Sequence, residues 1–225
     1  MNEPKTARKT TRDASKESRR LALIEATADT ILEHGLLGVS VSRILERVGL
    51  SRGMINLHFA TKNNLLTSVA EHYWTSYTAH WHHALDNAGT QPEARLRAII
   101  DADFDPVVLN RRSMAVWFAF RGEARSSPEF MAFIDSRDPK MLSALHEICV
   151  ALCAAGPYPE VDAQLVVLAL NAALEGLWTD FHLHPDQFDG SEARAVMLHM
   201  ARAFFPNHFG AAALRVAKRQ HSGSN

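Results

Sequence analysis

The sequence of 225 residues predicts an all-helical protein of about nine helices. Three observations support this fold class. Apolar residues recur at intervals of three and four, no segment alternates apolar and polar residues as a strand does, and turn residues separate the periodic segments. We expect a small N-terminal domain of three helices and a larger helical C-terminal domain.

The composition is that of a globular protein. Hydrophobic residues make up 47% of the sequence and charged residues 22%, which excludes general disorder. The longest uncharged stretch of interest, residues 163–174, is too short for a bilayer span of about 20 residues. The first twenty residues are basic and no apolar segment follows them, so we expect no secretory signal. Two cysteines fit a reducing compartment, and a cytoplasmic location is the expectation.

Charge is divided unevenly along the chain. The 24 Lys and Arg residues nearly balance the 25 Asp and Glu residues, which gives a net charge of −1. Residues 1–66 hold eleven bases and seven acids, net +4, whereas residues 67–225 hold thirteen and eighteen, net −5. This asymmetry favours a polyanionic partner at the N-terminal end.

The first helix is predicted by an apolar stripe that consists of Leu21, Ile24, Ala28, Ile31 and Gly35. Ser15 or Ser18 is expected to cap this helix, and the helix is expected to end near His34. Residues 1–16 lack a core-facing stripe, so we expect them to form a flexible basic arm.

Two short helices joined by a tight turn are predicted next. Ser40 is expected to cap a helix of about two turns that Gly49 ends, and Ser51 to cap a second helix over residues 52–57. Two short helices with a glycine turn between them are the pattern of a helix-turn-helix. Thr61 is then expected to cap a long helix.

The remaining two-thirds of the chain is predicted as further helices separated by clear breaks. The breaks are at residues 87–89, 105–106, 126–128, 156–159 and 185–190, where Pro, Gly, Ser, Asn and Asp gather. We expect one domain over residues 17–66, a second over residues 67–210, and a mobile tail at residues 211–225.

Residues 40–66 read SVSRILERVGLSRGMINLHFATKNNLL, a string that resembles the DNA-binding domain of the TetR family of bacterial repressors. The resemblance is carried by Ser40, Ile44, Gly49, Ser51, Gly53, His58, Phe59, Lys62 and Leu65. It implies a helix-turn-helix domain with a short recognition helix. The DNA-binding residues that we expect are Ser40, Arg43, Ser51, Arg52, Gly53, Asn56, Leu57, His58 and Lys62.

The residue types agree with this role. A helix placed in the major groove needs polar or small residues exposed near its start, and Arg52, Gly53 and Asn56 are of that kind. Ile55 and Phe59 are expected to face inward. A plain helical packing unit with a basic face is the alternative reading of the same segment.

The resemblance further implies that Ser40, His58 and Lys62 contact phosphates, which would position the domain without specifying a sequence. The chain departs from the family at Asn56 and Leu57, where Tyr or Trp is frequent, so the operator sequence cannot be carried over. The basic arm either follows the DNA or is a solvated electrostatic tail. Its bases are Lys5, Arg8, Lys9, Arg12 and Lys16.

The segment at residues 161–183 is apolar nearly all round, so it must be covered on all sides. Paired with residues 191–205, it is expected to form half of an intersubunit four-helix bundle, the arrangement that this family commonly uses. A central core helix in a monomer is the alternative. The interface residues that we expect are Leu165, Leu168, Ala172, Gly176, Met197 and Met200.

Residues 115–130 and 173–183 resemble the C-terminal domain of the BetI-type, choline-sensing repressors, with aromatic helices around Trp117 and Trp178. Aromatic faces and a carboxylate are what a quaternary ammonium ion needs. A choline-like cation, another small organic ligand and no ligand all remain open. The ligand-binding residues that we expect are Trp117, Phe118, Arg121, Glu175, Trp178 and Phe181.

Other constellations carry no chemistry in this reading. His80, His82 and His83 lack further ligands at a matching turn, so we expect no metal site and no cofactor. Cys149 and Cys153 are expected to be small buried residues. We expect a homodimeric repressor that a small-molecule effector releases from a palindromic operator. A ligand-independent nucleoid protein and a helical enzyme with a basic arm are the alternatives.

Overall fold

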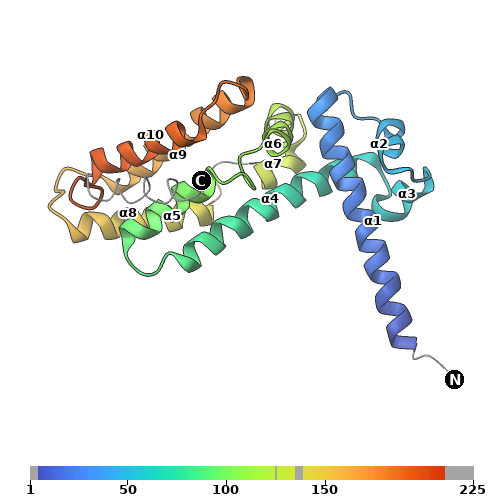
Figure 1. The fold of residues 1–225 in the computed structure, drawn as a ribbon, viewed down its shortest axis with the longest axis horizontal. Coiled ribbons are helices and arrows are strands. Elements are labelled where there is room, and N and C mark those ends of the chain that lie inside the picture. The colour runs from blue at the N-terminus through green and yellow to red at the C-terminus, as the bar shows by residue number, and fades with distance from the viewer. Residues whose placement is uncertain (1–4, 125, 135–138, 211–225) are drawn as a thin grey trace, which may run out of the picture. The chain divides into compact units, whose positions relative to one another are not determined.

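The computed structural model of the chain describes residues 5–124, 126–134 and 139–210. These residues form ten α-helices and one 3₁₀ turn, and no strand occurs among them, which confirms the all-helical prediction (Figure 1). There is one α-helix more than the nine expected, and the shortest of the ten, α7, has only four residues. The helices are α1 Lys5–His34, α2 Val41–Val48, α3 Gly53–Phe59, α4 Lys62–Asn87, α5 Pro92–Asp103, α6 Arg111–Glu123, α7 Met131–Ile134, α8 Pro139–Ala155, α9 Ala163–Leu183 and α10 Gly190–Phe204.

The chain divides into two compact units. The first lies within residues 1–76 and 111–135, and the second within residues 77–110 and 136–225. The helix α6 therefore belongs to the same unit as the helix-turn-helix segment, because its buried residues Val116 and Phe120 join the core of α1. The expected boundary at residues 66 and 67 differs from this division, since α4 continues without a break from one unit into the other.

Helix α1 begins earlier than the apolar stripe predicts. It starts at Lys5, so Ser15 and Ser18 lie inside the helix and neither caps it, and the expected arm at residues 1–16 is helical from Lys5 onward. The sequence holds neither Gly nor Pro between Lys5 and His34, so nothing in it ends the helix sooner. The tail at residues 211–225 lies outside the described residues.

The turn between the two short helices is built as the sequence predicts. The hydroxyl of Ser40 accepts from the backbone N–H of Arg43 at 3.3 Å, and Gly49 ends α2 with φ of 63°, a left-handed conformation that favours glycine. Ser51 does not cap α3 with its side chain. Its carbonyl instead accepts from the N–H of Met54, and α3 starts at Gly53.

The start of α4 is also built as predicted, because the hydroxyl of Thr61 accepts from the N–H of Asn64 at 3.1 Å.

In the second unit, one apolar core is surrounded by α5, α8, α9, α10 and the later part of α4. Cys149 is fully buried there, as expected, and Cys153 is half-buried; both are free thiols. Burial raises the pKa of the Cys149 thiol to about 12.

Candidate DNA-binding surface and effector site

Helix α3 presents one polar and exposed side. Ile55 and Phe59 are 2% and 5% exposed and point into the core, as predicted. The positions on the other side, Arg52, Gly53, Asn56 and Leu57, are all exposed, and Leu57 is 63% exposed. A large apolar side chain so open on a short helix is suited to contact with a partner, for example with a thymine methyl group.

Gly53 is not required by the fold of the chain. A Cβ added at this position would meet no neighbour nearer than the hydroxyl of Ser51, at 3.9 Å, and the residue does not adopt positive φ. Gly49 contrasts with it, since its left-handed conformation explains the glycine. Neither a contact nor a backbone conformation within the described part of the chain requires glycine at the exposed start of α3. The absence of a side chain there is consistent with the close approach of an external backbone.

Two bases hold the loop between α1 and α2. The guanidinium of Arg43 donates to the carbonyl of Gly38 at 2.6 Å, and the ammonium of Lys62 donates to the carbonyl of Val39 at 2.6 Å. These contacts tie the starts of α2 and α4 to one loop and so fix the position of α3 between them. Ser51 lies exposed before α3.

His58 is less open than the sequence suggests. Both of its ring nitrogens are buried and have no hydrogen-bond partner among the described residues. Burial lowers the pKa of His58, and the nearby Lys16, Arg19 and Arg20 lower it further against an opposing effect of Glu17, which favours the neutral ring. This placement corrects the expectation that His58 offers a phosphate contact. The ring packs beside Phe59 instead, with ring centroids 6.1 Å apart.

The six expected ligand-binding residues are divided between the two units. In the first unit, Arg121 lies over the rings of Trp117 and Phe118, with its guanidinium carbon 5.8 and 5.9 Å from their centroids. Trp117 also stacks with Trp74 at 6.5 Å. In the second unit, Phe181 packs edge-on against Phe188. Glu175 and Trp178 lie in a separate cluster of that unit.

This second-unit cluster is centred on a buried carboxylate that sequence analysis missed. Asp103, at the end of α5, is 3% exposed and accepts a hydrogen bond from the hydroxyl of Tyr77 on α4 at 2.9 Å. Its backbone carbonyl accepts from the indole N–H of Trp178 on α9 at 3.3 Å. The rings of Tyr77 and Trp178 meet edge-on at 5.6 Å, and the charge of Glu175 acts on Tyr77.

No Lys, Arg or His among the described residues forms an ion pair with Asp103. Burial raises the pKa of its carboxyl to about 7, and the hydrogen bond from Tyr77 offsets this only in part. A signal was present in the sequence, because Asp103 continues the buried face of Leu96, Ile99 and Ile100. An acid on an otherwise apolar helix face is a marker of function.

A second surface is the apolar face of α9 and α10. The expected interface residues Leu165, Leu168, Ala172 and Gly176 are all exposed along one side of α9. Met197 is instead 3% exposed and packs in its own unit, so its assignment to the interface is wrong.

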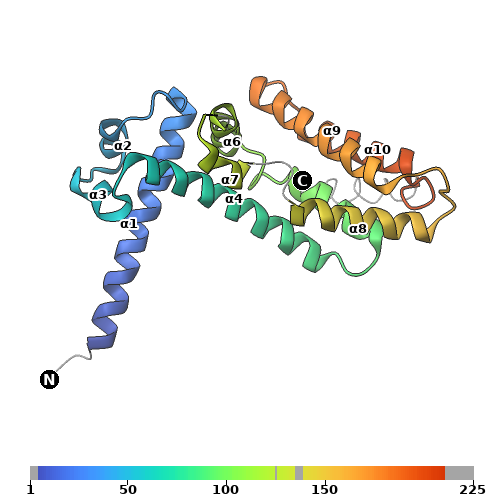
Figure 2. The ribbon, with the colours of Figure 1, turned by 180° about the vertical axis from the view of Figure 1, so that it is seen from behind.

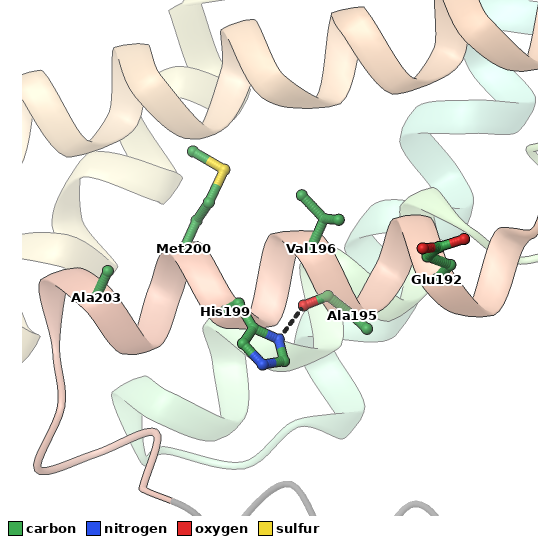
Figure 3. Close-up of a pocket in the computed structure, with 6 residues that line it drawn as sticks. All are labelled: Glu192, Ala195, Val196, His199, Met200 and Ala203. Carbon is green, nitrogen blue, oxygen red and sulfur yellow. Dashed lines mark hydrogen bonds between the residues drawn. The ribbon is translucent and has the colours of Figure 1, made fainter.

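Met200 lines a groove of about 500 Å³ on α10, together with Glu192, Ala195, Val196, His199 and Ala203 (Figure 3). The ring of His199 turns back along the helix, and its Nδ1 donates to the carbonyl of Ala195 at 2.8 Å.

The described residues contain no group of three or more His, Cys, Asp and Glu side chains that could hold a metal ion. His80 faces Asp105, with 3.9 Å between a ring nitrogen and a carboxylate oxygen.

None of the helices in the described part of the chain is long and apolar enough to cross a membrane.

The fold and the exposed side of α3 define a helix-turn-helix DNA-binding protein with a helical C-terminal domain. Comparison with known proteins gives the same class. The sequence profile of the bacterial regulatory proteins of the tetR family matches residues 23–69, and that of the BetI-type transcriptional repressor C-terminal domain matches residues 92–206.

The chain is 31% identical over 179 residues to the HTH-type transcriptional regulator BetI of Stenotrophomonas maltophilia, which covers 79% of this chain and 88% of that protein. A putative transcriptional regulator from Pseudomonas aeruginosa superposes with a TM-score of 0.73 at 26% identity, covering 86% of this chain and 93% of that one.

A regulator from Saccharomonospora viridis, solved in complex with choline, has a TM-score of 0.71 at 16% identity and covers 80% of this chain and 94% of that one. The chain belongs to the TetR family of transcriptional regulators, with a C-terminal domain of the BetI type. Regulators of this family bind DNA and act as dimers with small-molecule effectors.

Gly53→Ala is expected to separate stability from DNA binding. Alanine favours the helix and meets no neighbour, so the free energy of unfolding should stay level or rise by about 0.5 kcal/mol. The added methyl group would obstruct close approach, and DNA affinity should fall at least tenfold. Gly122→Ala on α6, where a Cβ is also unobstructed, is the matched control for urea denaturation and fluorescence anisotropy. Equal DNA affinity for both variants would contradict the role of Gly53.

Asp103→Asn is expected to change how stability depends on pH. The folded-state pKa of about 7 lies above the ordinary value near 4, so the folded protein binds this proton more tightly and loses stability as pH rises between the two values. Asparagine does not titrate. The variant should therefore gain about 2–3 kcal/mol in free energy of unfolding relative to the wild type between pH 5 and pH 8. Parallel pH profiles for the variant, the wild type and exposed Asp86→Asn would contradict this assignment.

Proposed function

We propose that this regulator is a cytoplasmic, non-enzymatic repressor that binds a palindromic operator as a homodimer and is released by a small organic cation. The exposed side of α3 reads the major groove, and the cation binds in the second unit beside Asp103. The observation that carries the choice of effector is the buried carboxylate of Asp103, which no base of the described residues neutralises.

An ionised carboxylate in this environment is costly unless a positive charge meets it. A protein that keeps such a group either holds it protonated or supplies a cation from outside. Because burial raises the pKa of Asp103 to about 7, the protonated and ionised forms of its carboxyl have similar free energies near neutral pH. A bound cation would favour the ionised form, so its affinity should rise with pH up to about 7.

The groups around Asp103 suit a cation that carries methyl groups. The rings of Tyr77 and Trp178 supply aromatic surface, and Glu175 supplies a second carboxylate on α9. Quaternary ammonium ions bind where ring faces and negative charge converge. The likeness to BetI regulators and to a regulator solved with choline supports this chemical class.

A homodimer is supported by the exposed side of α9. Leu165 and Leu168 are 63% and 49% exposed, and the small residues Ala172 and Gly176 follow them at helical spacing. The groove on the neighbouring α10, lined in part by Ala195, Val196, Met200 and Ala203, adds further apolar positions, and a second copy would cover both. Two copies would place two α3 helices about 34 Å apart, one turn along the groove.

Asp103→Asn is expected to abolish the response to a cationic effector. The amide keeps the shape and the acceptor for Tyr77 but removes the negative charge. Choline should raise the melting temperature of the wild type and leave that of the variant unchanged. The neutral isostere 3,3-dimethylbutan-1-ol should have little effect on either protein.

The control is Asp86→Asn, which removes an exposed carboxylate from α4 of the same unit and should respond to choline as the wild type does. Equal shifts from choline and its neutral isostere would show that the effector is recognised by apolar contact alone. A wild type that responds to neither compound, nor to betaine aldehyde or polyamines, would rule out the cationic class.

Leu165→Glu with Leu168→Glu is expected to give a folded monomer. Both side chains are largely exposed within one chain, so the substitutions should not disturb its core, but a carboxylate at a buried interface is strongly unfavourable. Sedimentation should show a dimer for the wild type and a monomer for the variant at micromolar concentration. Leu37→Glu, at a leucine that is 93% exposed in the first unit, is the control and should remain dimeric. A dimeric double variant would place the interface elsewhere.

A further inference from the structure

The N-terminal half of α1 carries a row of bases on one side. The seven bases of the first twenty residues fall at intervals of three, one, three, four, three and one, which confines their positions to an arc of about 120° on the helix. We call this row the basic stripe; it consists of Lys5, Arg8, Lys9, Arg12, Lys16, Arg19 and Arg20. The positions on the opposite side, Ala7, Thr11, Ala14 and Ser18, are small and carry no charge.

The charges of this stripe destabilise the helix that carries it. Bases three and four residues apart repel one another, and the first turn of α1 contains no acid to balance the positive end of the helix dipole. Every position from Ala14 to Arg19 is exposed, so burial does not compensate for the repulsion. Among Lys16, Arg19 and Arg20, only Arg20 forms an ion pair with a described residue, Glu17, at 3.7 Å. Both views of the ribbon show this half of α1 running on past α3, with no other helix of its unit along it (Figures 1 and 2).

The stripe leads directly to the recognition helix. The charges of Lys16, Arg19 and Arg20 all act on His58 of α3. Arg20 lies over the ring of Phe59, with 5.4 Å between its guanidinium carbon and the ring centroid, and donates to the hydroxyl of Ser68 at 3.3 Å. Arg20 therefore anchors the inner end of the stripe to α3 and α4, while Lys16 and Arg19 stay exposed beside them.

We propose that the basic stripe of α1 is a second DNA-contacting element, which binds the phosphates of the duplex that flanks the bases read by α3. This rests on the proposed use of α3 as the recognition helix. Duplex DNA presents closely spaced phosphates that would relieve the repulsion within the stripe. The opposite side has no large apolar residue, which disfavours a membrane-bound amphipathic helix.

The reach of the stripe sets the length of the operator. At a rise of about 1.5 Å per residue, the helix from Lys5 to Lys16 extends about 16 Å, which corresponds to nearly five base pairs. Each protomer would thereby protect phosphates beyond its half-site. A helical stripe and a solvated tail of the same charge differ in one respect, because only in the helix does the face on which the bases lie matter.

Three proteins test this: the full-length wild type, Arg12→Ala with Lys16→Ala, and the same double variant with Ala14→Lys and Ser18→Arg added. The third protein restores the charge on the opposite side of the helix. Binding is measured by fluorescence anisotropy over a salt series, on a duplex that the wild type selects from a random library and on a non-operator duplex of equal length.

The double variant should reduce the slope of log affinity against log salt by about 0.9 for each phosphate that the helix no longer binds, up to about 3.6 for two bases in each of two protomers. Its affinity near 0.1 M salt should fall at least tenfold. The relocated variant should be as weak as the double variant. Both should keep the wild-type ratio of operator to non-operator affinity, because α3 is unchanged.

A relocated variant that binds like the wild type would overturn the stripe in favour of an unstructured electrostatic tail. An unchanged salt slope in the double variant would also overturn the proposal that the stripe binds DNA. If the wild type then bound vesicles of anionic lipid and the double variant did not, the stripe would be assigned to membranes. A wild type that binds operator and non-operator duplexes equally would instead refute the proposed function. The variant Arg52→Ala, which should lose the preference for the operator, tests the role of α3 separately from that of the stripe.

Discussion

The packing of α6 against α1 is the constraint on which the arrangement of the first unit depends. Arg112 at the start of α6 pairs with Glu25 and Asp29 of α1, each at 2.6 Å, and His72 of α4 approaches Glu25 at 3.3 Å. Behind these charges, Phe120 of α6 is fully buried in the same core as α1. A helix that the BetI-type profile assigns to the C-terminal domain is thus built into the unit that carries α3.

For an effector bound at the proposed site beside Asp103, this construction gives a physical route to the unit that carries α3. Tyr77, which donates to Asp103, follows Tyr73 by one turn of α4, and Tyr73 lies against Arg112 in the ion-pair cluster of α1 and α6. A cation that took the place of the Tyr77 hydroxyl at Asp103 would act on α4 one turn from the contacts that hold α1. Release of DNA then requires only that the cation bind one arrangement of α4 more tightly than the other.

Local features of the fold could be predicted from sequence, and long-range ones could not. Ser40, Gly49 and Thr61 were predicted as caps because a cap depends on a few adjacent residues. Ser51 has the right residue type but bonds through its carbonyl. Met197 was placed at the interface because helical spacing does not tell which of two apolar sides meets the same chain. Asp103 was missed because its meaning depends on Tyr77, which lies 26 residues away.

Two places in the chain hold ionisable groups that the described residues neutralise at most in part, and the groups have opposite signs. Asp103 has no basic partner among the described residues, and in the stripe Arg20 pairs with Glu17 at 3.7 Å. Asp103 is a buried carboxyl enclosed by apolar and aromatic residues, whereas the basic stripe of α1 is positive and is exposed at Lys16 and Arg19. Each arrangement is unfavourable alone and becomes favourable when a partner of opposite charge binds. A cation has no affinity for the stripe, and a polyanion is excluded from a buried carboxylate. The two proposed ligands therefore do not compete for one site, and an influence of one on the other would require that each ligand bind one of two arrangements of the chain more tightly.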